Sequence, residues 1–479
     1  MSKDLVSELS AEERVRLNFS LDCVSPNDGK YRKASQALAF FLSPRAEWIA
    51  CAFVQRALLE TRIELGHVHE SHLTHFEKAL EKIDPANISL LEEKITKHDQ
   101  LALLEEFGRF IPQETKALLH PGTTSYDILD TARAYLFKKA WKDVLRGEIG
   151  KSILKLAGLA EQSLDILQVG RTHLQNTSPV PFGTTLAAYS ARLAERTERC
   201  DETFDRLKGK ISGIVGTGAS IEMVVGDSLA FEEKVLAKLG LTPDYTATQI
   251  VQKEALADVG NSLVTLMHVL EDFSEDIRLL YSTAIGEVTS RDNATRLGGS
   301  SADALKNNPI DYENISGKAA QIESGMRVLY TMISSNFQRD LRGSIQARYQ
   351  PQGMITEIYE SFTRLNRALE QLSLNEDRIR ENLQTVRDNP SEAMVAILRG
   401  EGWAHSHYGV GHDFVKEIGK KRKGRKLLEV ALEDSEFTRL YETLSEDKKD
   451  ILQGQLEKYT GSAKQRALKN IAYARSVIQ

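Results

Sequence analysis

The sequence predicts an all-α protein of three mainly helical domains, with a central domain built as a bundle of long helices. Two observations support this fold class. Apolar residues recur at helical spacing over long stretches, and prolines are too rare to interrupt them, since 479 residues contain only 11. Alternating polar and apolar residues, which are typical of half-buried strands, are scarce. Helices should therefore account for most of the chain.

The clearest helix is predicted around residues 256–280. Its apolar residues follow one another at steps of three and four without a break, as on the buried seam of a long helix in a bundle. The seam consists of Leu256, Val259, Leu263, Leu266, Leu270, Phe273, Ile277 and Leu280. A second, shorter stripe consists of Ile149, Ile153, Leu156, Ala160 and Leu164.

Long proline-free stretches permit the other long helices. No proline falls between Pro181 and Pro243, between Pro243 and Pro309, or between Pro309 and Pro351. We therefore expect a division into three parts. These are an N-terminal helical domain (1–122), a central long-helix bundle (123–373) and a C-terminal domain of shorter, more polar helices (374–479).

Composition argues against several classes of protein. Charged residues make up 27% and apolar residues 41% of the chain, as in an ordinary globular protein, and a net charge of −6 argues against a nucleic-acid partner. The charged N-terminal segment lacks the apolar core of a signal peptide, and no run of eighteen apolar residues suggests a membrane span. Three widely spaced cysteines fit a reducing cytoplasm. We expect a cytoplasmic protein.

No metal site is predicted. His72 and His75 could share a helix face. No acidic–histidine motif of known metal chemistry surrounds them, so a solvated helix face is the better interpretation.

The segment Gly299–Asn314 carries the most informative group of polar residues. Two adjacent hydroxyls at Ser300 and Ser301 are followed by Lys306, Asn308 and Glu313. The segment resembles the signature loop of the fumarase/aspartase superfamily, Gly-Ser-Ser-x-Met-Pro-x-Lys-x-Asn-Pro, and its end is most similar to the adenylosuccinate lyases. This chain departs from the pattern at residues 303–304, where Asp-Ala replaces Met-Pro.

Three further segments resemble the same superfamily in the same order. They are Lys97–Asp99, His120–Ala132 and Gly170–Gln175, the last followed by Phe182-Gly183. Four such segments over more than two hundred residues make the resemblance specific, although it fades after about residue 375.

The chemistry of the superfamily explains why these residue types occur. Release of fumarate from a succinyl-amine removes a weakly acidic proton beside a carboxylate. The site therefore needs a base, donors for the developing charge and an acid for the leaving nitrogen. The resemblance implies that Ser300 is the base and His173 the acid. It implies that Lys306 activates Ser300, Glu313 orients His173, and Asn308 donates to a substrate carboxylate.

The resemblance also implies residues that bind the substrate. Thr124 and Ser125 match a hydroxyl pair that binds a substrate carboxylate, and His98, Asp99 and Gln249 match further substrate-binding positions. For the nucleotide end the implied residues are Arg339, Ser344 and Arg348, which match the nucleotide-binding segment of adenylosuccinate lyases, together with Lys30 and Tyr31, which match an arginine–tyrosine pair that meets the phosphate. Arginine suits phosphate because its planar fork of donors matches the phosphate oxygens.

The implied function is release of fumarate from adenylosuccinate, to give AMP, and from the succinylated carboxamide ribotide of purine synthesis. The implied assembly is a homotetramer with shared active sites, without a metal or organic cofactor. Two alternatives remain at this point. The chain could be a fumarate-releasing lyase with a different amine substrate, because Asp303 adds a negative charge near a dianionic substrate. It could also be a non-catalytic relative, although retention of the polar site residues argues against this.

Overall fold

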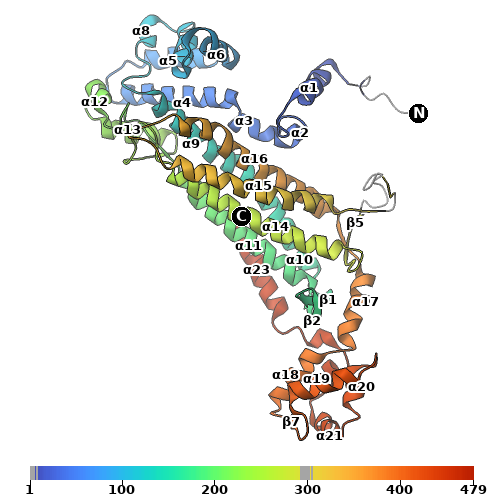
Figure 1. The fold of residues 1–479 in the computed structure, drawn as a ribbon. Helices are drawn as coiled ribbons and strands as arrows, with labels where there is room; N and C mark the ends of the chain where they lie inside the picture. The colour runs from blue at the N-terminus through green and yellow to red at the C-terminus, as the bar shows by residue number, and fades with distance from the viewer. Residues whose placement is uncertain (1–5, 7–8, 292–301, 304–305) are drawn as a thin grey trace. The chain divides into compact units, whose positions relative to one another are not determined.

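The computed structural model describes residues 6, 9–291, 302–303 and 306–479. Helices dominate these residues, which confirms the predicted all-α class (Figure 1). The chain packs into two compact units. Unit 1 comprises residues 1–149, 196–268 and 317–363, and unit 2 comprises residues 150–195, 269–316 and 364–479. The division into three consecutive domains stays a prediction.

The helices follow one another closely along the chain. In order they are α1 (Ala11–Asp22), α2 (Arg32–Ser35), α3 (Ala39–Leu42), α4 (Pro44–Glu64), α5 (Ser71–Leu80), α6 (Pro85–Leu91), α7 (Asp99–Gly108), α8 (Gln113–Lys116), α9 (Ser125–Ala140), α10 (Arg146–Gln162), α11 (Phe182–Asp205), α12 (Ala219–Val225), α13 (Ser228–Lys238), α14 (Glu254–Tyr281), α15 (Ile310–Met332), α16 (Arg342–Gln371), α17 (Glu376–Arg387), α18 (Ser391–Gly400), α19 (Gly411–Lys421), α20 (Leu427–Ala431), α21 (Ser435–Thr443), α22 (Glu446–Leu452) and α23 (Ala463–Ile478).

The other elements are short. The 3₁₀ and π segments are η2 (Gln36–Leu38), η3 (Glu92–Thr96), η4 (Trp141–Leu145) and η6 (Leu456–Lys458). The strands pair two by two as β1 (Leu167–Thr172) with β2 (Gln175–Pro181), β3 (Lys208–Gly209) with β4 (Thr242–Pro243), β5 (Val288–Ser290) with β6 (Leu372–Leu374), and β7 (Ala404–His405) with β8 (Gly409–Val410). The β3–β4 pair is parallel and the other three are antiparallel.

Both predicted apolar stripes are confirmed. Helix α14 spans 28 residues and contains the whole predicted seam. The buried members of that seam are Val259, Leu263, Leu266, Leu270, Phe273 and Ile277. All five residues of the second stripe, along α10 and just beyond its end, are buried as well. Apolar spacing of this kind therefore located the core-facing sides of two long helices correctly.

Helix α16 continues through a proline. It spans 30 residues with Pro351 inside it. Proline lacks the N–H that would bond the carbonyl four residues earlier, so this position costs helix stability. The buried residues that follow, such as Met354, Ile355 and Ile358, supply the packing that keeps the helix continuous.

The core of unit 1 is built around helices α4 and α9. Ser43 caps α4 by accepting the N–H of Ala46 at 3.2 Å, and Pro44 follows as the first helical residue. Helix α4 buries twelve of its 21 residues, and it packs along α9. Beside them, the rings of Phe76 in α5 and Phe107 in α7 stack with centroids 4.5 Å apart.

The stretch Arg32–Glu64 contains one segment that is long and apolar enough, by length and composition, to cross a membrane. A core helix of a soluble protein passes the same test. Here the stretch is not one helix, because Ser43 adopts an extended backbone before α4 begins. The buried face of α4 also explains its apolar composition.

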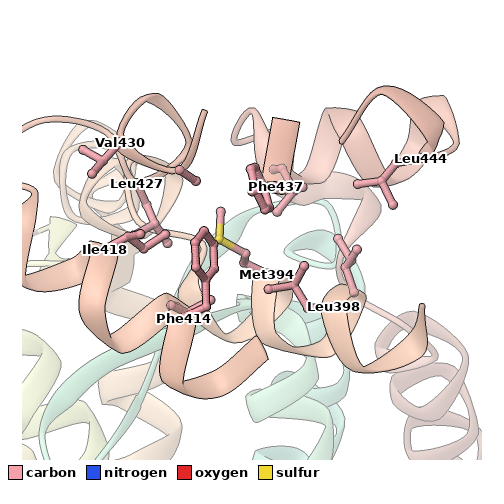
Figure 2. Packing of buried hydrophobic residues seen from close by; sticks show 12 residues of the cluster. Met394, Leu398, Phe414, Ile418, Leu427, Val430, Phe437 and Leu444 are labelled. Atoms are coloured by element: carbon pink, nitrogen blue, oxygen red, sulfur yellow. The ribbon is translucent and has the colours of Figure 1, made fainter. Parts of the chain in front are cut away.

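The C-terminal helices of unit 2 enclose a hydrophobic cluster of their own. Figure 2 shows the side chains that meet there from α18, α19, α20 and α21. The cluster includes Met394, Leu398, Phe414, Ile418, Leu427, Val430, Phe437 and Leu444. The rings of Phe414 and Phe437 lie with centroids 5.5 Å apart. This part of the chain therefore has its own packed core.

Gly183 allows a close approach at the start of α11. A Cβ at this position would lie 2.1 Å from the carbonyl oxygen of Ala160 and 2.9 Å from the nitrogen of Leu164. The Gly183 N–H donates to the carbonyl of Ser163 at 3.0 Å, which fixes the backbones in that position. Glycine is required here because both contacts are with backbone atoms, which cannot rotate away.

We predict that Gly183→Ala destabilises the protein by about 1–3 kcal/mol, because the added methyl group forces two backbones apart. The measurement is the shift in the urea unfolding midpoint. Gly158→Ala is the matched control on α10, since a Cβ there meets no atom within 4 Å. Because alanine favours helix, the control should be neutral or stabilising by up to about 1 kcal/mol. Equal destabilisation by both substitutions would contradict this packing argument.

Candidate active site

Thr124 and Ser125 stand where α9 begins, in unit 1. Thr124 is the N-cap, and its N–H donates to the Asp127 carboxylate at 2.6 Å within a capping box. Unpaired N–H groups and the helix dipole give this end of the 16-residue helix partial positive charge. The two hydroxyls predicted to bind a carboxylate therefore lie at a helix end that favours anions.

Asp127 fixes this helix end to the loop at residues 210–213. Its carboxylate and the Lys210 ammonium form an ion pair in which both side chains are fully buried. The carboxylate also accepts the N–H of Ser212 at 3.0 Å and the N–H of Gly213 at 3.2 Å. Buried charges need such complete pairing. One carboxylate therefore holds both the loop and Thr124.

His98 lies beside Ser125, so the fold brings together two of the expected substrate-binding residues. Its Nε2 is 3.3 Å from Ser125 Oγ, and its Nδ1 is 3.4 Å from Asp99 Oδ1. Burial raises the pKa of the neighbouring Glu92 carboxyl, the Asp99 charge raises it further, and the Arg348 guanidinium opposes both. The structure thus places Arg348 within electrostatic reach of this group.

His120 belongs to the same neighbourhood and was not among the predicted site residues. The backbone N–H of His120 donates to Gln55 Oε1 at 3.0 Å, and the ring Nδ1 of His120 lies 3.0 Å from Gln55 Nε2. The amide nitrogen must donate in the second contact, so Nδ1 accepts and Nε2 carries the proton. Burial lowers the pKa of His120, which favours this neutral form. The one feature of the sequence that could have pointed to His120 as a site residue is its position as the first residue of the 120–132 segment.

A second cluster in unit 1 contains three predicted binding residues, Arg339, Gln249 and Ser344. Tyr126, which was not predicted, contacts two of them. Arg339 Nη1 donates to Gln249 Oε1 at 2.8 Å. The Arg339 guanidinium carbon lies 3.9 Å from the centroid of the Tyr126 ring, and the Tyr126 hydroxyl donates to Ser344 Oγ at 2.6 Å. Tyr126 directly follows Ser125 in the chain, which was the only signal for it in the sequence.

Lys30 and Tyr31 do not join this cluster by any direct contact among the described residues. The Tyr31 ring instead lies 5.4 Å from the Lys318 ammonium, which pairs with Glu357 at 2.7 Å. The role of Lys30 and Tyr31 in phosphate binding stays a prediction.

His173 occupies the turn of the β1–β2 hairpin in unit 2. The pair Thr172–Gln175 closes the turn, and both central residues have positive φ, 54° for His173 and 60° for Leu174. Two such residues suit a tight hairpin turn, but Leu174 pays a steric cost in this conformation. Strained backbone of this kind often marks a functional site. The exposed imidazole makes no hydrogen bond or ion pair with other described residues.

The hairpin is anchored by a buried ion pair. Arg171 donates to both carboxylate oxygens of Glu287, at 2.6 and 3.0 Å, and Glu287 is fully buried. Asn382 donates to the same carboxylate at 2.8 Å. The hairpin borders a hollow of about 600 Å³ that His173 helps to line. Across it, Tyr189 donates to Asp276 at 2.6 Å.

The predicted signature loop is described only in part. Ser300 lies outside the described residues. The Lys306 N–H donates to the carbonyl of Asp303 at 3.2 Å, just before α15, and Glu313 lies exposed in the first turn of that helix. Asn308 precedes α15 as well. Among the described residues no contact joins Glu313 to His173, so the predicted orienting contact stays a prediction.

No group of three or more candidate metal ligands occurs in the part of the chain that the structure describes. His72 and His75 instead place their Nδ1 atoms 2.8 and 3.2 Å from the same Thr115 hydroxyl. Chemically, unit 1 gathers hydroxyls, amides and arginines, which bind anions, and unit 2 presents a histidine able to transfer protons.

Comparison with known structures establishes the fold. The 3-carboxy-cis,cis-muconate lactonizing enzyme from Pseudomonas putida matches with a TM-score of 0.78, over 93% of this chain and 98% of that chain. The sequence identity is 21%, so this similarity shows the shared fold alone.

Comparison of sequences defines the family. A family model described as lyase matches residues 47–324, which is more than half of the chain. The chain therefore belongs to this lyase family, within the fumarase/aspartase superfamily. An adenylosuccinate lyase from Archaeoglobus fulgidus is 27% identical over 89% of this chain and 93% of its own length. One from Pyrococcus horikoshii is 29% identical over 88% of this chain and 91% of its own length.

We predict that Asp127→Asn destabilises the protein by about 3–5 kcal/mol, because it removes the carboxylate charge that pairs directly with the buried Lys210 ammonium. The measurement is the free energy of unfolding from urea denaturation. Glu202→Gln is the control, since it breaks an ion pair with Arg199 whose side chains are 52% and 61% exposed. That change should cost less than about 1 kcal/mol. An Asp127 variant as stable as the control would show that the buried pair does not hold this region.

Proposed function

We propose that this lyase is an adenylosuccinate lyase, which releases fumarate from adenylosuccinate to give AMP and acts likewise on the succinylated carboxamide ribotide of purine synthesis. The observation that carries the proposal is the match to adenylosuccinate lyases over nearly nine-tenths of the chain. The cluster of Arg339, Gln249 and Ser344 supports it, because these side chains offer donors suited to a phosphate.

The proposed reaction is a β-elimination. Ser300, activated by Lys306, removes the proton from the succinyl carbon next to a carboxylate. The electron pair left on that carbon forms the double bond of fumarate as the bond from the neighbouring carbon to nitrogen breaks. His173 supplies the proton that the departing nitrogen needs, with Glu313 holding the imidazole.

Anion binding explains the remaining residues. The developing charge falls on a carboxylate that is already ionised, so donors near it lower the barrier. In this proposal Thr124, Ser125 and His98 receive one carboxylate, and Asn308 receives charge at the other. The helix end at Thr124 adds its partial positive charge to the first of these.

The proposed assembly is a cytoplasmic homotetramer in which subunits share active sites, with a nucleotide as the small-molecule substrate. Shared sites would bring together the proposed catalytic and binding residues, which come from several separate segments of the chain. Exposed apolar residues on the long helices, such as Leu154 and Ile345, are available for self-association.

We predict that Ser300→Ala and His173→Ala each lower turnover of adenylosuccinate by about 10²-fold or more, because each removes a proton-transfer group. Turnover is followed by ultraviolet absorbance as AMP and fumarate form. Ser301→Ala and His407→Ala are the controls, because they remove a neighbouring hydroxyl and an exposed imidazole outside the proposed site. Near-normal turnover in either catalytic variant would reassign that role, and inactivity of the unaltered protein would overturn the function.

A second prediction concerns the nucleotide end. Arg348→Ala should weaken AMP as a product inhibitor by about tenfold or more, since a charged contact to phosphate is worth about 1.5–3 kcal/mol. Calorimetric titration with AMP measures the affinity. Arg327→Ala on α15 is the control, because it also removes an exposed arginine. Unchanged AMP affinity in the Arg348 variant would favour a lyase with a different substrate.

A further inference from the structure

Tyr126 is the one member of the second cluster without a predicted role. Its side chain is buried, at 5% exposure, directly after the two hydroxyls at the start of α9. It makes two polar contacts. The ring face lies under the guanidinium of Arg339, and the hydroxyl donates to Ser344 Oγ. Tyr126 therefore contacts two of the three residues of this segment that are proposed to hold the nucleotide phosphate, Arg339 and Ser344.

The direction of the hydrogen bonds decides what the cluster can bind. Because Ser344 Oγ accepts the tyrosine proton, the hydrogen of the Ser344 hydroxyl remains available, and no described residue accepts it. Gln249 likewise uses its oxygen to accept from Arg339, which leaves its NH₂ group available. The oxygen atoms of Ser344 and Gln249 thus accept hydrogen bonds from within the cluster, whereas the Ser344 hydroxyl hydrogen and the Gln249 NH₂ group remain available to a ligand. Such an arrangement binds anions and disfavours cations and neutral donors.

The charge of Arg339 is also left unneutralised. No carboxylate of a described residue lies within ion-pair distance of it. The adjacent carboxylate, Asp340, is bound by two nitrogens of Arg342, at 2.6 and 3.0 Å. Hydrogen bonds from Arg342 lower the pKa of Asp340 to about 2, so that carboxylate stays ionised and paired with Arg342. The Tyr126 ring stabilises the remaining guanidinium through its negative face.

We propose that Tyr126 is a positioning residue for the phosphate site: it holds Arg339 by its ring and keeps Ser344 as a hydrogen-bond donor through its hydroxyl. This inference rests on the proposed function for the identity of the phosphate as that of AMP or adenylosuccinate. Tyr126 does not touch the reacting atoms. Its effect should therefore appear in phosphate affinity and in KM, with little change in kcat.

Tyr126→Phe tests the hydroxyl while keeping the ring. Without the tyrosine proton, the Ser344 hydroxyl is no longer fixed as a donor, and AMP affinity should fall about three- to tenfold, as for loss of one neutral hydrogen bond. Tyr126→Leu also removes the ring and should weaken AMP binding further. Adenosine, which has no phosphate, should bind the Phe variant as well as it binds the unaltered protein. Calorimetric titration of the full-length protein gives these affinities.

A double-mutant cycle separates positioning from a merely structural role. Ser344→Ala should lower AMP affinity, and Tyr126→Phe should have no further effect in that background, because the two act through one hydroxyl. Tyr330→Phe is the matched control, since its hydroxyl donates to Asn261 at 2.6 Å elsewhere in unit 1. It should leave AMP affinity unchanged. Additive losses, or equal losses for AMP and adenosine, would overturn the role of Tyr126.

The outcomes also separate this inference from the function on which it rests. If the unaltered protein does not turn over adenylosuccinate, the proposed function fails, while selective loss of AMP binding in the Phe variant would still support Tyr126. If the unaltered protein turns over adenylosuccinate and the Phe variant keeps full AMP affinity, the function stands and the role of Tyr126 is wrong.

Discussion

The buried carboxylate of Asp127 is the constraint on which the binding half of this protein depends. It faces the Lys210 ammonium with both side chains removed from water, and it accepts N–H groups from Thr124 and from the loop at residues 212–213. A charge at this depth is stable only when all its partners are in place. The same contacts set where α9 begins. The ion pair therefore also fixes the positions of the Thr124 and Ser125 hydroxyls at the start of that helix, and of Tyr126, which follows them in the chain.

The proposed binding residues of unit 1 offer mainly hydrogen-bond donors to a ligand. The start of α9 offers a helix end with unpaired N–H groups, and the Arg339 cluster offers donors whose own acceptors are already occupied. A dianionic succinyl group and a phosphate both require such donors. The Arg348 guanidinium lies within electrostatic reach of the nearby Glu92 carboxyl and opposes the rise in its pKa that burial and the Asp99 charge cause. The hydrogen-bond directions as well as the charges of these residues therefore favour an anionic ligand, as the proposed function requires.

The sequence predicted the fold well where buried residues recur at a regular spacing. It predicted less well the contacts that single side chains make with residues far along the chain. The seam of α14 was visible because a buried helix face repeats every three to four residues. Pro351 ends one of the proline-free stretches that were expected to permit long helices, yet tertiary packing carries α16 through it. Tyr126 and His120 were not assigned because their roles depend on partners far along the chain, Arg339 for one and Gln55 for the other. No local pattern encodes such pairs.

A crystal structure of the protein with AMP and fumarate bound tests the central claim most directly. Phosphate oxygens should lie within hydrogen-bond distance of Arg339 and Ser344, with the Tyr126 hydroxyl still donating to Ser344 and the Arg339 guanidinium still over the ring. A fumarate carboxylate should lie at the start of α9, beside Thr124 and Ser125. A phosphate bound away from this cluster, or fumarate bound away from that helix end, would show that the proposed binding site is wrong.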